Sequence, residues 1–187
     1  EVSAEVRFAR EEYDYTFGPA ITTAPVPDPV TGLYPFTFAP GDPQAADAKT
    51  TYVAPRFAIQ YEPKDDLLLY ASAARGVKPA GITQVAGSNN PEEGAFDEEF
   101  LWNYEAGFKS TLMDGRVQFN AAAFRMEYTD KQVSTLRPVS PEINPQGTIT
   151  VIENIGEAVV NGAELGLAWL PFPDLNVSVN YTYLDTE

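Results

Sequence analysis

Bulky residues alternate with small or polar residues along much of the chain. The stretch LWNYEAGFKS, residues 101–110, shows the pattern most clearly, because its aromatic residues and Ala106 fall on even positions and its charged residues on odd positions. Successive side chains of a strand point to opposite faces, so this stretch predicts a strand with one apolar and one polar face. In a soluble β-sandwich the polar face meets water, whereas in a membrane barrel the apolar face meets lipid and the polar face lines a lumen.

The same period of two recurs in about seven segments, while helical periodicity is essentially absent. The predicted strands cover residues 2–8, 53–61, 67–78, 101–110, 117–128, 163–169 and 175–183. In the fifth segment the alternation changes parity around residues 121–123, and Phe124, Met126 and Tyr128 continue on the other parity. Two explanations stay open at this point: a β-bulge, or aromatic side chains turned into a lumen.

Short and long connections alternate strictly between these segments. The tight turns are predicted at residues 63–66, 114–115 (a two-residue Asp-Gly hairpin turn) and 171–174, and the long polar connections at residues 17–49, 79–99 and 134–150. In an up-and-down meander every second connection lies at the same end, so all short turns should share one rim. Short turns at one rim and long loops at the other are typical of outer-membrane barrels.

Aromatic residues stand near the predicted strand ends. Trp102 and Tyr104 lie near a long connection, and Tyr61, Trp169 and Phe172 lie near short turns. These are the positions of the aromatic girdles that mark the two membrane interfaces. The alternative is the ordinary preference of aromatic residues for strands.

Composition excludes several function classes. The 187 residues contain no cysteine and no histidine, which excludes disulfide frameworks, Cys/His zinc sites and Ser-His or Cys-His nucleophiles. The formal net charge of −15 repels phosphate backbones, so we expect no nucleic-acid partner. No apolar run reaches the roughly 18 residues of a membrane-spanning helix, and the sequence predicts no catalytic residue, no cofactor and no metal site.

The motifs, taken in order, resemble the β-barrel of TonB-dependent outer-membrane receptors. The segments VSAEVRFAREEYDYT and APRFAIQYEPKDDLLLYASAARGVKPAG are similar to strands of that family, the second ending in an Arg-Gly-x-Lys-Pro edge. NYEAGFKSTLMDGRVQFNAAAFRMEYTDKQ and ENIGEAVVNGAELGLAWLPFPDLNVSVNYTYLD are similar to its Asn-Tyr-Glu and Gly-x-Glu strand pairs. The chain departs from the family pattern at Ala80, where the family has glycine, and around Asn154-Ile155-Gly156.

The resemblance implies an all-β fold, namely an antiparallel up-and-down transmembrane β-barrel segment of about seven strands out of a barrel of ~22. Residues 1–187 would form part of the barrel domain, and we expect the plug domain, the TonB box and the closing strand to be absent from them. The implied location is the bacterial outer membrane. The implied function is TonB-energised import of a scarce ligand such as a ferric siderophore, with the TonB-ExbB-ExbD complex, outer-membrane lipid and lipopolysaccharide as partners.

Polar residues on the predicted lumen side are the first candidate ligand contacts. They are Arg56, Asn103, Glu105, Lys109 and Glu164. The alternative is that they only line the lumen or contact the plug, since a large barrel interior is polar in either case.

The long connections supply a second group of candidates. Tyr34, Phe36 and Phe38 would grip a ligand, or would pack on each other in a plain loop hairpin. Arg75 and Lys78 stand near the outer rim, where they would attract an anionic siderophore or meet lipopolysaccharide or water. The acidic stretch from Glu92 to Glu99 is either a solvated loop or a site for a hard cation.

Two rival functions remain at this stage. A non-transporting outer-membrane barrel or adhesin would share the strands. A soluble all-β carbohydrate-binding domain or hydrolase would use paired carboxylates, but adjacent residues such as Glu98 and Glu99 point apart in a strand and cannot flank one bond. No loop carries a recognisable code for the ligand.

Overall fold

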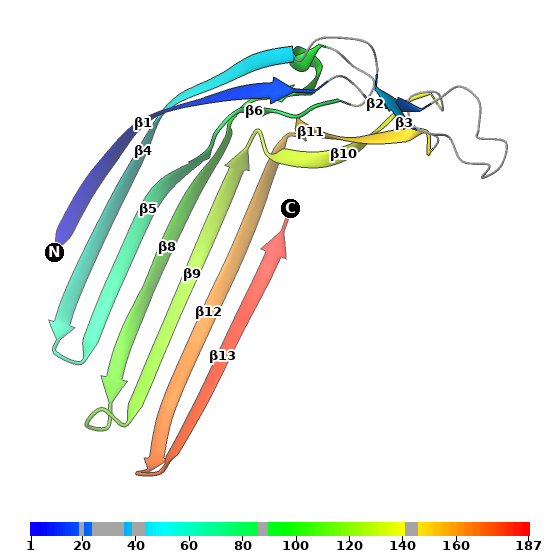
Figure 1. Ribbon diagram of the computed structural model, residues 1–187. Helices are drawn as coiled ribbons and strands as arrows, with labels where there is room; N and C mark the ends of the chain where they lie inside the picture. The colour runs from blue at the N-terminus through cyan, green and yellow to red at the C-terminus, as the bar shows by residue number, and fades with distance from the viewer. Residues whose placement is uncertain (19–20, 24–35, 39–43, 86–89, 141–145) are drawn as a thin grey trace.

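A single seven-stranded antiparallel sheet dominates the computed structural model, which describes residues 1–18, 21–23, 36–38, 44–85, 90–140 and 146–187. Its strands stand side by side in chain order (Figure 1). They are β1 (Val2–Phe17), β4 (Gln44–Lys64), β5 (Leu67–Lys78), β8 (Glu99–Leu112), β9 (Val117–Thr129), β12 (Glu157–Phe172) and β13 (Leu175–Thr186). The predicted meander of seven strands is therefore confirmed, and the sheet is open at β1 and β13.

The short turns all lie at one end of the sheet. Figure 1 shows the β4–β5, β8–β9 and β12–β13 turns together at the end opposite the long connections, as the alternation of connection lengths predicts. The β8–β9 turn differs in detail from the predicted two-residue hairpin. Leu112 pairs with Val117, so four residues form the loop, and Met113, Asp114 and Gly115 all have positive φ. A run of three such residues needs a longer loop than a two-residue turn provides.

The long connections contain more β-structure than the sequence predicts. Their described residues form three two-stranded ribbons and one short 3-10 helix: β2 (Ile21–Thr23) with β3 (Phe36–Phe38), β6 (Gly81–Ile82) with β7 (Ala95–Phe96), β10 (Gln132–Pro138) with β11 (Thr148–Asn154), and η1 (Pro91–Gly94). Residues 134–138 and 148–150 of the expected loop thus belong to the two strands of a hairpin. Likewise β1 reaches Phe17 and β4 begins at Gln44, because the two strands continue to pair with each other beyond the apolar part of the sheet. Across the described residues, no helix has the length and hydrophobicity required to cross a membrane.

The strand register separates the side chains into an apolar face and a polar face. Residues that face each other across a ladder share a face, so the register can be followed from strand to strand. The predicted apolar set falls on one face: Val53, Phe57, Ile59, Ala106, Phe108, Leu165, Leu167, Val177 and Val179. Arg56, Glu105, Lys109 and Glu164 fall on the other face, so the predicted separation of the two sets is confirmed.

No bulge interrupts β9. Its register with β8 and with β12 is continuous from Val117 to Thr129. Phe124 therefore lies opposite Glu105 on the polar face, and Met126 and Tyr128 lie on the same face. Of the two explanations for the parity change, the structure selects aromatic side chains on the polar face.

The apolar face is exposed and ends at a line of polar residues. Phe8, Phe57 and Tyr181 have 77%, 50% and 56% of their surface accessible. Closer to the long connections, the side chains on the same face are polar, and they include Arg10 and Arg125. Near this boundary the rings of Trp102 and Tyr104 stack, with centroids 5.8 Å apart. β9 has 13 residues and β13 has 12, enough for the roughly 9–11 residues of a membrane-crossing strand.

The buried core of the described residues lies among the long connections. Val151 is 2% exposed, and it clusters with Ile149 of β11, Val85 and the half-buried Val139. The β10–β11 hairpin thus packs on the connection between β5 and β8. Described parts of two long connections therefore pack against each other at this end of the sheet.

Candidate functional site: the polar face of the sheet

Tyr70 of β5 lies on the polar face of the sheet and contacts two charged residues of β8. Its hydroxyl donates a 2.7 Å hydrogen bond to Glu105 Oε1, and Lys109 Nζ lies 5.9 Å from the centroid of its ring. These residues belong to a cavity of about 240 Å³ between β4, β5 and β8. Its polar lining consists of Arg56, Gln60, Tyr70, Ser72, Glu105 and Lys109. The cavity therefore offers both cationic and anionic groups together with neutral donors.

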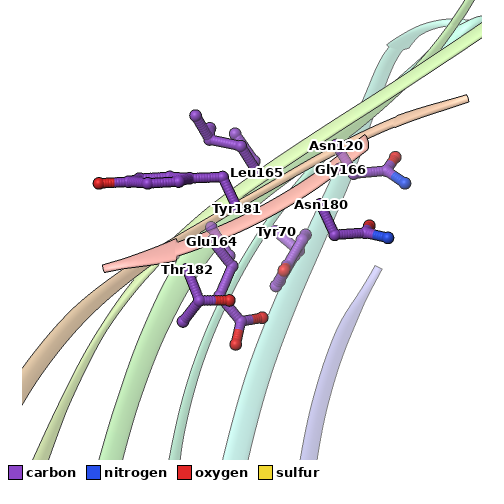
Figure 2. Close-up of a pocket in the computed structure, with 10 residues that line it drawn as sticks. Tyr70, Asn120, Glu164, Leu165, Gly166, Asn180, Tyr181 and Thr182 are labelled. Carbon is purple, nitrogen blue, oxygen red and sulfur yellow. The ribbon is translucent and has the colours of Figure 1, made fainter. Parts of the chain in front are cut away.

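A second cavity, of about 250 Å³, continues the polar face toward β13. In Figure 2 the side chains of Glu164, Thr182 and Tyr70 project on the side of the sheet opposite Leu165 and Tyr181. Its polar lining consists of Tyr70, Asn120, Glu164, Asn180 and Thr182. Tyr70 contributes to both cavities, so the two form a continuous polar surface across β4 to β13.

Glycines on the neighbouring strands make room for the aromatic rings of this face. Gly107 lies opposite Tyr70, and a Cβ placed on it would be 2.8 Å from the Tyr70 hydroxyl and 2.5 Å from the Ala121 carbonyl oxygen. Gly162 lies opposite Phe124, where a Cβ would be 2.3 Å from the ring. Aromatic residues that cover glycines across a ladder stabilise the pairing of the strands. The Gly residues of the NYEAGF and NGAELG motifs thus position the rings of the polar face.

The structure brings four of the five predicted lumen residues to these cavities. Arg56, Glu105 and Lys109 line the first cavity and Glu164 lines the second. Arg56 also lies 3.9 Å from Glu5 in an exposed ion pair. Asn103 shares the polar face, between Ala74 and Met126, but lines neither cavity.

The sequence interpretation missed Tyr70. The signal was present, because Tyr70 and Ser72 occupy the even positions of β5, opposite the parity of Leu69 and Ala71. The run of leucines that begins this strand hides the parity, so only pairing with the neighbouring strands β4 and β8 assigns Tyr70 to the polar face.

The outer-loop candidates have different surroundings. Phe36 and Phe38 are the ends of β3, paired with Thr23 and Ile21, and Tyr34 lies outside the described residues. Lys78 lies opposite Glu99 on the polar face. Arg75 lies on the opposite, apolar face with its guanidinium over the ring of Phe100 at 4.3 Å. Arg75 and Lys78 therefore face different environments.

The acidic stretch 92–99 secures the base of the β10–β11 hairpin. Gln132 and Asn154, the first pair of that hairpin, both donate side-chain hydrogen bonds of 2.9 Å to the Asp97 carbonyl oxygen. Asn154 Oδ1 accepts a 2.7 Å bond from the Asp97 amide, and Glu99 Oε2 accepts a 2.8 Å bond from the Gln132 amide. We call these four residues the hairpin clamp. Among the described residues, no group of three or more acidic side chains is placed to hold a metal ion.

An ion pair between β10 and β11 stabilises the part of the hairpin beyond the clamp. Arg137 Nη2 lies 2.9 Å from Glu153 Oε1, and the Thr135 hydroxyl donates a 2.8 Å bond to Glu153 Oε2. Hydrogen bonds from Arg137 and then Thr135 lower the pKa of the Glu153 carboxyl below its usual value. The carboxylate form therefore favours the folded hairpin.

Residues 3–187 match the model of the TonB dependent receptor-like β-barrel family. The chain belongs to this family. A probable TonB-dependent siderophore receptor, PiuA of Acinetobacter baumannii, is 30% identical to it over 146 residues, which are 76% of this chain and 18% of PiuA. The metal-pseudopaline receptor CntO of Pseudomonas aeruginosa is 32% identical over 133 residues, 71% of this chain and 16% of CntO. The TonB-dependent receptor chain described here thus spans less than a fifth of the length of these curated relatives.

The fold agrees with solved receptors of the family. The ferric yersiniabactin uptake receptor FyuA of Yersinia pestis superposes with a TM-score of 0.67 at 23% identity, covering 100% of this chain and 24% of FyuA. This identity supports the fold alone. Family members are outer-membrane β-barrel proteins, so the exposed apolar face of this barrel segment meets lipid and the polar face looks toward the lumen.

Proposed function

We propose that this chain forms part of the wall of an outer-membrane receptor that imports a scarce ligand such as a ferric siderophore. The observation that carries the proposal is the match of residues 3–187 to the receptor barrel family. The two-faced sheet and the packed connections at one rim support it, because an importing barrel needs a lipid-facing wall, a polar lumen and loops that meet the ligand outside. Siderophore and metal-pseudopaline receptors among the relatives support a chelated metal as the ligand class.

Energy for import would come from TonB, working with ExbB and ExbD across the periplasm. These partners would act on a plug domain inside the closed barrel. Outer-membrane lipid would cover the apolar face, and lipopolysaccharide would contact the polar residues where that face ends, which include Arg75 and Arg125.

The polar face would serve the ligand or the plug. Glu105 and Lys109 stand with Tyr70 in one cavity and present opposite charges to the lumen. The β2–β3 ribbon with Phe36 and Phe38 would meet the ligand earlier, at the outer rim. Lumen substitutions tune selectivity in such barrels.

Uptake by a full-length receptor containing this chain tests the proposal. Cells that express the receptor should accumulate labelled ferric siderophore, and deletion of TonB should abolish accumulation. Lys109→Gln should leave barrel assembly intact and lower uptake, because it removes a lumen charge next to Tyr70. A siderophore panel that gives no TonB-dependent accumulation, while the barrel is correctly assembled, would favour the non-transporting barrel instead.

A further inference from the structure

Toward the long connections, the sheet divides between β4 and β5. The β4–β5 ladder ends at the pair Arg56 and Ala74, while β4 remains paired with β1 up to Gln44 and β5 remains paired with β8 up to Lys78. Figure 1 shows β1 and β4 diverging from β5 toward the long connections. Closer to the long connections, the Ala80 amide, just after β5, donates a 3.0 Å hydrogen bond to the Thr50 hydroxyl of β4. This contact joins β4 to the chain that follows β5.

Three arginines surround the opening. A cavity of about 460 Å³ lies there, in the range of about 300–1,000 Å³ that small-molecule sites occupy. Its charged lining consists of Arg7, Arg56, Arg75 and Glu5. In a chain of net charge −15, the lining of this cleft carries three positive charges and one negative charge.

The arginines are weakly neutralised by their neighbours. Arg7 and Arg56 lie 3.9 Å from Glu11 and Glu5, at the outer limit of an ion pair. Arg75 Nη1 donates a long 3.4 Å bond to the carbonyl oxygen of Val53, a residue that pairs with β1 but not with β5. Arg75 Nε is buried and has no hydrogen-bond partner within the described part of the chain. A buried guanidinium nitrogen without a partner points to an anion or water as the missing acceptor.

We infer that this arginine cleft binds a phosphate-class oxyanion. A guanidinium presents a planar fork of donors that fits phosphate oxygens, and a phosphate accepts from several arginines at once, whereas a carboxylate has only two oxygens. The cleft stands where the apolar face ends, so a phosphate headgroup of an outer-leaflet lipid reaches it from the side of Arg75. A free phosphate reaches it from the side of Arg7 and Arg56, which lie on the polar face. The inference does not depend on which ligand the receptor imports.

Binding to two probes tests the arginine cleft. A full-length receptor containing this chain is delipidated in detergent and titrated with inorganic phosphate by calorimetry. The same receptor in phosphatidylcholine nanodiscs, with or without phosphatidic acid, is then examined by native mass spectrometry for retained phosphatidic acid. Arg75→Gln and Arg56→Gln should each weaken binding about tenfold or more, because each removes a charge-assisted donor. Arg116→Gln, which removes the same charge at the short-turn rim, should leave binding unchanged.

The outcomes show whether the site binds an anion and whether that anion is a lipid headgroup or a free phosphate. Retention of phosphatidic acid alone assigns the cleft to a lipid headgroup, and binding of inorganic phosphate as well assigns it to a freely accessible anion; both support the inference. Absence of binding to both probes, equal binding by the wild type and the two cleft variants, or an equal loss in Arg116→Gln would overturn it. Heat-modifiable gel mobility checks that each variant folds. If Arg75→Gln does not assemble, the result for Arg56→Gln alone tests the inference, because the Arg56 side chain is 61% exposed and its substitution should not disturb folding.

Discussion

Tyr70 and Glu105 are joined by a 2.7 Å hydrogen bond between β5 and β8, on the face of the sheet that looks into the lumen. They are diagonal neighbours, because Tyr70 lies opposite Gly107 and Glu105 lies opposite Ser72. The absence of a side chain on Gly107 leaves space for the ring, which brings the hydroxyl to the carboxylate. Gly107 thus allows the Tyr70 hydroxyl to reach the Glu105 carboxylate.

Tyr70→Phe should lower the stability of the assembled barrel by about 1 kcal/mol, because it removes this hydrogen bond and keeps the ring over Gly107. The temperature at which the receptor loses its heat-modifiable gel mobility measures the effect. Tyr61→Phe is the matched control, since Tyr61 is 62% exposed near the short-turn rim. A loss as large in the Tyr61 variant as in the Tyr70 variant would contradict a specific role for the bond.

Leu167→Arg should impair assembly of the barrel. Leu167 lies on the apolar face between Phe119 and Val179, and a cation near the bilayer midplane of that face costs roughly 2–4 kcal/mol. Thr182→Arg introduces the same side chain on the polar face, opposite Glu164, and should assemble normally. Folding into lipid vesicles, followed by gel mobility, compares the two. Normal assembly of the Leu167 variant with failure of the Thr182 variant would mean that the faces are inverted.

Asn154→Ala should loosen the β10–β11 hairpin without disturbing the sheet. Asn154 makes two hydrogen bonds with Asp97 in the hairpin clamp and a third with the Asp130 carbonyl oxygen outside it. Losing them should lower the local free energy of opening by about 1 kcal/mol or more, which is at least about fivefold faster amide exchange over the hairpin. Hydrogen exchange measures this, with the exposed Ser134→Ala as control. Unchanged exchange in the Asn154 variant would show that the clamp does not stabilise the hairpin.

The same hairpin should become less stable in acid. The pKa of Glu153 is lowered in the folded state by its bonds from Arg137 and Thr135, so its contribution is fully present above the unfolded-state pKa of about 4.3. The contribution is lost as the pH falls through the lower, folded-state pKa. Amide exchange of β10 and β11 at descending pH, corrected for intrinsic rates, should show this loss. Glu153→Gln should remove that part of the pH dependence, whereas Glu157→Gln, which has no ion pair among the described residues, should retain it.

The sequence predicts the sheet because alternation is a local property. Side chains on a pleated strand alternate whatever the partner strand is, so the parity of Phe108 or Leu167 already indicates its face. The positions of the short turns follow equally from turn residues and spacing. For this reason the seven strands, the shared rim of the turns and the four charged residues of the polar face were all predictable from the sequence.

The tertiary structure decides the features that depend on pairing partners. Thr135 and Arg137 look like part of the polar connection 134–150 until β11 pairs with them, and Tyr70 has no clear face until β4 and β8 fix its register. The parity change in β9 required two neighbouring ladders to distinguish a bulge from inward-facing aromatics.

The clamp and the arginine cleft illustrate the same limit. Gln132 is far in sequence from Asp97, and Arg7 is far from Arg75, and no periodicity connects them. The sequence by itself therefore determined the class of fold, the two faces and the family resemblance, since these follow from residue order along single strands. Only the tertiary structure decided which polar groups meet, because register and the divergence of β4 from β5 arise from contacts between distant segments.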